Sequence, residues 1–210
     1  RPASSEKKSG VVTGNPVREN VMNGDRQKSL LTYGLRGELP VLALLGGSQG
    51  AQVLNKAMEN ALKNFTDIQI LWQTGDSHLE TYRKYETDRV KVMPFVDDMG
   101  TFYAAADLII SRAGALALAE IAACGKPSLL IPFAGSAGNH QTMNAESLRA
   151  SGAAIVVNQK EFTSERLTDE VKQLMGNSQT LSKMASAARS VARPEAVDLI
   201  VNEIEVIAEA

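Results

Sequence analysis

The stretch Val41-Leu-Ala-Leu-Leu-Gly-Gly-Ser-Gln-Gly-Ala51 decides the fold of this chain. Its apolar run is typical of a buried strand, the glycines break that strand, and a helical pattern follows over residues 51–64. We expect Gly46, Gly47 and Gly50 to let the backbone approach a ligand closely, while the helix presents free N–H groups and its positive dipole end. The sequence therefore predicts a phosphate-binding turn, with a turn that merely needs glycine as the alternative. It matches neither the dinucleotide fingerprint nor the phosphate loop of NTP hydrolases.

The alternation of strand-like and helical segments continues along the chain. Apolar, strand-like runs lie at about 41–45, 68–72, 90–93, 107–110, 128–132 and 154–157. Helical patterns lie between and after them, at about 51–64, 77–86, 97–105 (with Asp97 or Asp98 as its cap), 115–124, 140–151 and 163–175. This alternation predicts an α/β fold, a Rossmann-like parallel sheet with helices on both faces. Ligands of such sheets bind outside the carboxyl ends of the strands, where the strand order reverses.

A second strand-to-helix joint, Asp107-Leu-Ile-Ile-Ser-Arg-Ala-Gly-Ala115, repeats this design. The helix after it is apolar nearly all round, which predicts that it is largely buried, yet it carries the carboxylate of Glu120. Because an unpaired buried carboxylate is costly, Glu120 needs a protein cation or a ligand. The two oxygens of a carboxylate suit the adjacent hydroxyls of a ribose. The alternatives are a position on a narrow exposed stripe or a pair with Arg112.

A third candidate segment is Ile131-Pro-Phe-Ala-Gly-Ser-Ala-Gly-Asn-His-Gln-Thr-Met-Asn144, where a glycine-rich strand end leads into the next helix. Its side chains Asn139, His140, Gln141 and Asn144 offer donors and acceptors of the kind that bind sugar hydroxyls. Asn139 is equally suited to be a simple helix cap.

Composition narrows the function. At 210 residues with 44% hydrophobic content the chain can bury a core, and it fits one domain with or without extensions. A net charge of −2 and few aromatic residues argue against nucleic-acid binding. The single cysteine, Cys124, suits a structural role in a reducing cytoplasm, and the sequence shows neither a metal-binding motif nor a membrane-spanning apolar run. Residues 195–210 form an apolar helical stripe, which predicts packing on this or a neighbouring domain.

Four motifs follow one another along the chain: Thr13-Gly-Asn-Pro-Val-Arg18, Gly46-Gly-Ser-Gln-Gly-Ala51, Ser111-Arg-Ala-Gly-Ala115 with Glu120, and Asn139-His-Gln-Thr-Met-Asn144. Together they resemble the C-terminal half of the MurG family of bacterial glycosyltransferases, over roughly residues 11–205. Members of this family add N-acetylglucosamine to an undecaprenyl-linked muramyl-pentapeptide, which converts lipid I to lipid II in peptidoglycan synthesis.

The resemblance implies the two-domain GT-B fold. Residues 1–14 would be a linker at the end of a missing N-terminal domain, and residues 15–210 would be the Rossmann-like domain that binds UDP-N-acetylglucosamine and carries a C-terminal helix. The missing domain would bind the lipid-linked acceptor. It would also attach the protein peripherally to the cytoplasmic face of the inner membrane.

The resemblance also implies a set of donor contacts. Glu120 would hold the ribose, and Val96 would bind the uracil edge through its backbone. Ser48 would contact the diphosphate, and Gln141 the sugar hydroxyls. The full set of substrate-binding residues is Arg18, Gly47, Ser48, Val96, Gly114, Ala115, Leu116, Glu120, His140 and Gln141. Two positions depart from the family: Trp72 stands where many members have histidine, and His140 stands where some have glutamine.

The implied reaction is an inverting displacement, in which an acceptor hydroxyl attacks the anomeric carbon of the donor while UDP leaves. Helix N-termini after Gly50 and Gly114 would stabilise the leaving diphosphate without a metal or cofactor. We expect no catalytic residue in this chain, because the candidate bases of the family belong to the N-terminal domain, and neither His78 nor His140 is favoured as a base.

Three other functions remain open at the level of sequence. The chain fits a stand-alone donor subunit of a split N-acetylglucosaminyltransferase, a UDP-sugar epimerase of the same fold, or a non-catalytic module that binds nucleotide sugars.

Overall fold

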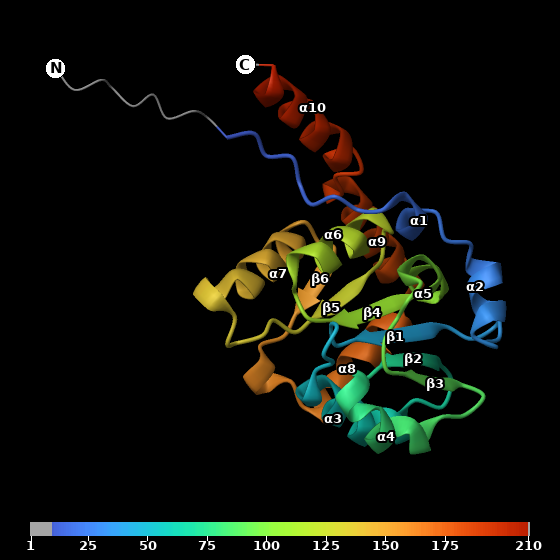
Figure 1. Ribbon diagram of the computed structural model, residues 1–210. Coiled ribbons are helices and arrows are strands. Elements are labelled where there is room, and N and C mark those ends of the chain that lie inside the picture. The colour runs from blue at the N-terminus through green and yellow to red at the C-terminus, as the bar shows by residue number, and fades with distance from the viewer. Residues whose placement is uncertain (1–9, 210) are drawn as a thin grey trace.

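The computed structural model describes residues 10–209 and shows one parallel sheet between two layers of helices (Figure 1). The strands are β1 (Val41–Leu45), β2 (Gln69–Gln73), β3 (Val90–Met93), β4 (Leu108–Ser111), β5 (Ser128–Leu130) and β6 (Ala154–Val156). They are ordered β3-β2-β1-β4-β5-β6, and every neighbouring pair is parallel. The chain therefore winds outward from β1 to β3, returns to β4 and winds to the other edge. The predicted Rossmann-like α/β fold is confirmed.

The two faces of β1 build two separate apolar layers, because successive side chains of a strand point to opposite sides. Leu42 and Leu44 pack on one side, and Val41 and Ala43 on the other. The first layer is covered by α3 (Gln52–Ala61), α4 (Leu79–Tyr82) and α8 (Ser164–Met175). The second layer is covered by α1 (Glu19–Met22), α2 (Arg26–Thr32), α5 (Met99–Ala105), α6 (Ala115–Ala123) and α7 (His140–Ala150). All five side chains of β1 are buried, as expected for a central strand covered on both faces.

Helix α9 (Ser178–Val191) was not predicted, and neither were the short helices α1 and α2. Helix α9 contributes Met184 to the first layer and Ala188 to the second, so it closes the edge between them. The helix predicted over 77–86 is broken into α4 and two flanking 3-10 turns, Asp76–His78 and Arg83–Tyr85. Three further 3-10 turns span Leu62–Asn64, Ala137–Asn139 and Gln159–Glu161.

Helix α10 (Ala196–Ala208) projects away from the sheet (Figure 1), and Gly14 lies against Arg193 and Ala196 at its start. Its apolar stripe is not packed on this domain, because Val197, Val201 and Ile204 are exposed and Ile207 is 74% exposed. The prediction that the stripe packs on its own domain is therefore wrong, whereas packing on a neighbouring domain stays a prediction. Within residues 10–209, no helix is both long and apolar enough to cross a membrane.

The exposure of α10 predicts that most of this helix adds little to the stability of the domain. A chain that ends at Ile200 should unfold in urea with a free energy within about 0.5 kcal/mol of the full chain, because every apolar side chain among residues 201–209 is exposed. Leu167→Ala in α8 serves as the contrast, since Leu167 is fully buried and its truncation should cost about 2–5 kcal/mol. A truncated chain as unstable as that variant would show that α10 packs on the domain in solution.

Asp98 is the cap of α5, which settles the choice between Asp97 and Asp98. Its carboxylate accepts hydrogen bonds from the backbone N–H (3.0 Å) and the hydroxyl (2.6 Å) of Thr101. Removing such a cap costs about 1 kcal/mol, so Asp98→Ala should lower the free energy of unfolding by that amount, and Asp97→Ala should not.

The effect of Asp98 should depend on pH. The hydrogen bonds from Thr101 hold the pKa of Asp98 below its usual value. A depressed folded-state pKa stabilises the fold above the pKa of the unfolded chain, and this stabilisation is lost as the pH falls through the folded-state pKa. Urea titrations at neutral and acid pH should therefore show the gap between wild type and Asp98→Ala closing in acid. A gap that is constant across this range contradicts the cap assignment.

Candidate functional site

The candidate site lies at the carboxyl ends of β1 and β4, which are neighbours in the middle of the sheet. The chain leaves β1 toward β2 and leaves β4 toward β5, so the two following loops diverge and open a crevice between them. The two glycine turns singled out in the sequence are these two loops. Helix α3 begins after the first turn and helix α6 after the second, so both N-termini lie at the same edge of the sheet.

The first turn needs two of its glycines for a steric reason that the sequence does not reveal. A Cβ on Gly46 would lie 2.6 Å from the backbone nitrogen of Ala51, and a Cβ on Gly50 would overlap the carbonyl oxygen of Thr74. These two glycines are therefore required by contacts with the protein's own backbone, and their approach to a ligand stays a prediction. Gly47 has a φ of +84° and open space around its Cβ position, and the exposed Ser48 hydroxyl has no hydrogen-bond partner within residues 10–209. Gly47 and Ser48 are thus free to meet a ligand.

Gln73, at the end of β2, fixes the first turn and was not identified from the sequence. Its side chain is buried, accepts a hydrogen bond from the N–H of Gly46 (2.9 Å) and donates to the carbonyl oxygens of Gly47 (2.9 Å) and Pro94 (3.0 Å). One amide group therefore joins the turn after β1 to the loop after β3. Because all these atoms lie at least 21 residues from Gln73 along the chain, no local sequence pattern reveals the contact.

The second turn leads into α6 with Gly114 as its N-terminal flanking residue. The first N–H groups of a helix have no partner within the helix, so those of Ala115 and Leu116 point out of its N-terminus. Leu116 is exposed there. The side chain of Arg112 turns aside: its guanidinium donates to the carbonyl oxygen of Ile131 (3.0 Å) and lies 5.6 Å from the ring centre of Phe133. Burial lowers the pKa of Arg112.

Glu120 is buried on α6, with 8% of its surface exposed. Its partner is the hydroxyl of Tyr103, which donates to Oε2 at 3.1 Å, so both alternatives, an exposed stripe and a pair with Arg112, are wrong. Burial raises the pKa of the Glu120 carboxyl, while the hydrogen bond from Tyr103 and the positive charge of Arg18 act in the opposite direction. Arg18 is exposed on the segment before α1, and its positive charge acts on this carboxylate without a direct ion pair in the described residues.

Val96 lies in the loop between β3 and α5 with its side chain buried. Within the described part of the chain, neither its backbone N–H nor its carbonyl oxygen makes a hydrogen bond. Since backbone groups near the protein interior are nearly always paired, these two groups are suited to pair with a ligand.

Gln141 and Asn144 connect the third candidate segment to the second turn. The side-chain oxygen of Gln141 accepts hydrogen bonds from the N–H groups of Ala113 (3.2 Å) and Phe133 (2.9 Å), which leaves its amide N–H groups as donors. Asn144 donates to the carbonyl oxygen of Ala113 (3.3 Å). His140 is exposed at the start of α7. The neighbouring Asn139 is the N-terminal flanking residue of α7, as the cap interpretation expects, but it has a φ of 55° and its side chain makes no capping hydrogen bond.

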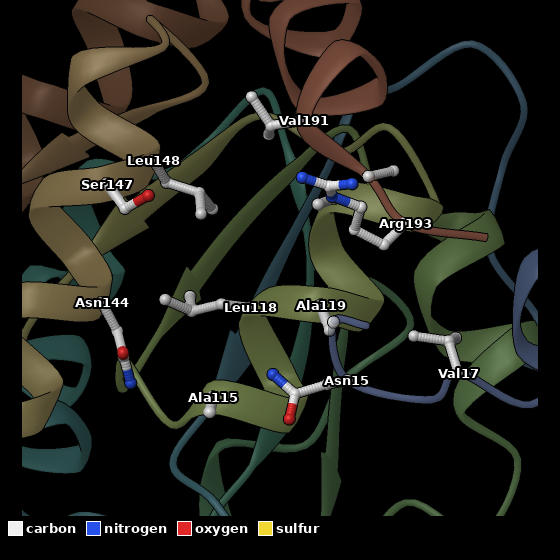
Figure 2. Close-up of a pocket in the computed structure, with 13 residues that line it drawn as sticks. Asn15, Val17, Ala115, Leu118, Ala119, Asn144, Ser147, Leu148, Val191 and Arg193 are labelled. Carbon is white, nitrogen blue, oxygen red and sulfur yellow. The ribbon is translucent and has the colours of Figure 1, made fainter. Parts of the chain in front are cut away.

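Two cavities flank the second turn. The first, of about 190 Å³, lies in a groove between α6 and α7, with Ala115 and Asn144 near one end and Leu148 and Arg193 farther along (Figure 2). The second, of about 360 Å³, lies between the start of α3 and Gln141. Its lining residues are Gly50, Ala51, Gln52, Val53, Arg112, Phe133, Gln141 and Gln159. Of the residues predicted to bind the donor, Ala115 therefore lines the first cavity and Gln141 lines the second.

Other sequence candidates have structural roles. Trp72 is fully buried and donates from Nε1 to Asn55 (2.9 Å), so it reaches no ligand. Cys124 is half-buried with its thiol against the carbonyl oxygen of Val21 (3.3 Å), and burial raises its pKa to about 11, which agrees with a structural role. Across residues 10–209, no three His, Cys, Asp or Glu side chains gather into a metal-binding cluster.

The strand order, and the position of both turns where that order reverses, define a domain of the Rossmann-like class. Residues 41–200 match the family described as glycosyltransferase family 28 C-terminal domain, and the chain belongs to this family. The expected GT-B fold class is thereby confirmed.

Individual relatives agree with this assignment. The chain is 38% identical to the UDP-N-acetylglucosamine–N-acetylmuramyl-(pentapeptide) pyrophosphoryl-undecaprenol N-acetylglucosamine transferase of Clostridioides difficile (strain 630), over 92% of this chain and 49% of the relative. The transferase of the same name from Desulfitobacterium hafniense (strain DSM 10664 / DCB-2) is 40% identical, over 91% and 55%. The crystal structure of Acinetobacter baumannii MurG has a TM-score of 0.76 and 33% identity, over 88% and 54%. The chain thus spans about half the length of these relatives, and the resemblance to the MurG family is confirmed.

Proposed function

We propose that this chain is the UDP-N-acetylglucosamine-binding half of an inverting N-acetylglucosaminyltransferase that converts lipid I to lipid II. The observation that carries the proposal is the pair of helix N-termini at the strand-order reversal, in a chain about 38–40% identical to transferases named for this reaction. On this proposal residues 15–210 form the donor domain. Residues 1–14 join it to an N-terminal domain, but most of this linker lies outside the described residues.

The free groups of the site support a specific arrangement of the donor. The diphosphate would lie between Gly47 and Ser48 on one side and the N–H groups around Gly114 on the other, since both helix ends favour anions. Glu120 would accept hydrogen bonds from the ribose hydroxyls, and the unpaired backbone of Val96 would pair with the uracil edge. The remaining proposed contacts are Arg18 to the nucleotide, Ala115 and Leu116 to the diphosphate, and His140 and Gln141 to the sugar.

This arrangement supplies electrostatic stabilisation of the leaving group. Negative charge develops on the diphosphate as the bond to the anomeric carbon breaks, and fixed N–H groups at the ends of α3 and α6 would stabilise it without reorganising. In this proposal the acceptor, the catalytic base and the attachment to the cytoplasmic face of the membrane belong to the N-terminal domain. The isolated chain should therefore bind the donor and transfer no sugar.

Calorimetric titration of the chain with UDP-N-acetylglucosamine, UDP-N-acetylgalactosamine and UDP tests this proposal. We expect binding of UDP and a preference for the N-acetylglucosamine donor over its C4 epimer, because Gln141 and His140 would contact the sugar hydroxyls. Equal affinity for both sugars contradicts the assigned sugar specificity. Glycosyl transfer by this chain alone, or conversion of the donor into an epimer, contradicts the assignment as a donor-binding half.

A further inference from the structure

The hydroxyl of Tyr103 on α5, which contacts Glu120 on α6, is a feature that packing does not require. The ring of Tyr103 is fully buried in the second apolar layer, beside Phe102 at 6.1 Å between ring centres. A phenylalanine would fill the same volume, so the hydroxyl is not needed to build this layer. The hydroxyl instead donates to Oε2 of Glu120, which is itself buried.

The other charged or titratable groups around Glu120 act on it differently. Arg18 attracts the carboxylate from the segment before α1, yet it forms no ion pair with it within residues 10–209. Cys124 lies one turn farther along α6, and its thiol is turned to the carbonyl oxygen of Val21. Lys126 interacts electrostatically with Cys124, and its ammonium donates to the carbonyl oxygen of Ala106 (2.9 Å). In the described part of the chain, Tyr103 is thus the one hydrogen-bond donor to this carboxylate.

We propose that Tyr103 is a positioning residue that orients the Glu120 carboxylate toward the ribose of a bound nucleotide. The hydroxyl holds Oε2 in place and leaves Oε1 free to accept from the ribose, so the carboxylate need not be ordered when the ligand binds. This inference rests on the proposed role of Glu120 as the ribose contact. It assigns to Tyr103 a part in selecting a ribonucleotide over its 2′-deoxy analogue.

Ionisation supports the same role. Burial raises the pKa of Glu120, and the Tyr103 hydrogen bond counteracts that rise, so the hydroxyl helps to keep the carboxylate charged near neutral pH. Burial and the nearby Glu120 raise the pKa of Tyr103 well above 10. The phenol therefore stays protonated and remains a donor wherever the carboxylate is ionised.

The test is Tyr103→Phe, titrated by calorimetry with UDP and with 2′-deoxy-UDP between pH 5 and pH 8. The affinity for UDP should fall about three- to tenfold, as expected for one hydrogen bond, while that for 2′-deoxy-UDP should change less. The affinity for UDP should fall in acid as Glu120 becomes protonated, and this fall, the acid limb of UDP binding, should lie at higher pH in the variant. The reason is that the carboxyl of the variant is protonated more easily. Tyr82→Phe is the matched control, since its ring is buried on the opposite face of the sheet.

A double-mutant cycle separates a role through Glu120 from a loss of packing. In the Glu120→Gln background, Tyr103→Phe should weaken UDP binding less than in the wild type, because the two side chains are in contact. The inference would be overturned if Tyr103→Phe reduced the affinity for UDP equally in both backgrounds. It would also be overturned if the variant kept the wild-type preference for UDP over 2′-deoxy-UDP and lost UDP binding at the same acid pH as the wild type. If Tyr103→Phe fails to fold, 3-fluorotyrosine can be incorporated instead, which keeps the ring and makes its hydroxyl a stronger hydrogen-bond donor. The acid limb of UDP binding should then move to lower pH, and an acid limb that does not move would overturn the inference.

The proposed function can fail separately from this inference. If the wild-type chain binds UDP and 2′-deoxy-UDP equally and Glu120→Gln changes neither, then Glu120 does not contact the ribose, and the inference fails with it. If Glu120→Gln abolishes the discrimination and Tyr103→Phe leaves it intact, then only the positioning role is wrong.

Discussion

Gly50→Ala is expected to destabilise the domain by about 3 kcal/mol, which combines the strain of a left-handed alanine with an overpacked contact. Gly50 has a φ of +71°, and a Cβ at this position would overlap the carbonyl oxygen of Thr74. Neither the turn nor β2 can yield easily, because Gly75 in turn faces the carbonyl group of Gln49. Thermal unfolding should show a melting temperature lower by roughly 6–12 °C.

Gly37→Ala is the matched control for Gly50→Ala. Gly37 is exposed, has no positive φ and has nothing within 4 Å of its Cβ position, so its replacement should leave the melting temperature within about 1–2 °C of the wild type. If Gly50→Ala has the same melting temperature as this control, then the backbone at Gly50 does not pack against Thr74 and Gly75 as closely as the structure shows.

Glu120→Gln is expected to weaken UDP binding about ten- to a hundredfold, because charge-assisted hydrogen bonds to the ribose are replaced by neutral ones. The shape of the side chain is conserved, and its oxygen can still accept from Tyr103. Calorimetric titration at neutral pH measures the loss. Glu146→Gln is the control, since Glu146 lies on α7 in an exposed ion pair with Arg149, and it should bind UDP like the wild type.

The same Glu120→Gln substitution should not destabilise the unliganded domain. Because burial places the folded-state pKa of Glu120 above that of the unfolded chain, the free energy of unfolding falls as the pH rises through the folded-state pKa. A neutral glutamine removes this loss. At neutral pH the variant should therefore melt at or above the wild-type temperature, and a large drop in its melting temperature would show that Glu120 is structural rather than reserved for a ligand.

The sequence predicted the sheet well because its signals are local. All six strands agree with the predicted runs to within about two residues, since apolar runs bounded by glycine and proline report directly on buried parallel strands. Helix α9 was missed because it buries few side chains, chiefly Met184 and Ala188, and its small polar residues give no continuous apolar stripe.

The partners within the site could not be predicted, because they are distant along the chain. The steric requirement for glycine at position 50 could not be predicted, since the backbone atoms that impose it belong to Thr74 and Gly75. Tyr103 was not recognised as the partner of Glu120 for the same reason, as 17 residues separate them. The sequence located the buried carboxylate correctly, whereas only the folded structure shows that the Tyr103 hydroxyl on α5 holds it.

The side chain of Gln73 has one more consequence. Its amide group is hydrogen-bonded both to the turn proposed to bind the diphosphate and to the carbonyl oxygen of Pro94. Pro94 lies two residues before Val96, whose backbone is proposed to bind the uracil. A displacement of either loop therefore strains the hydrogen bonds of the other. The base and the phosphates of a nucleotide would meet one mechanically coupled surface, so the affinities of uridine and of pyrophosphate, measured as separate fragments, should not simply combine into that of UDP.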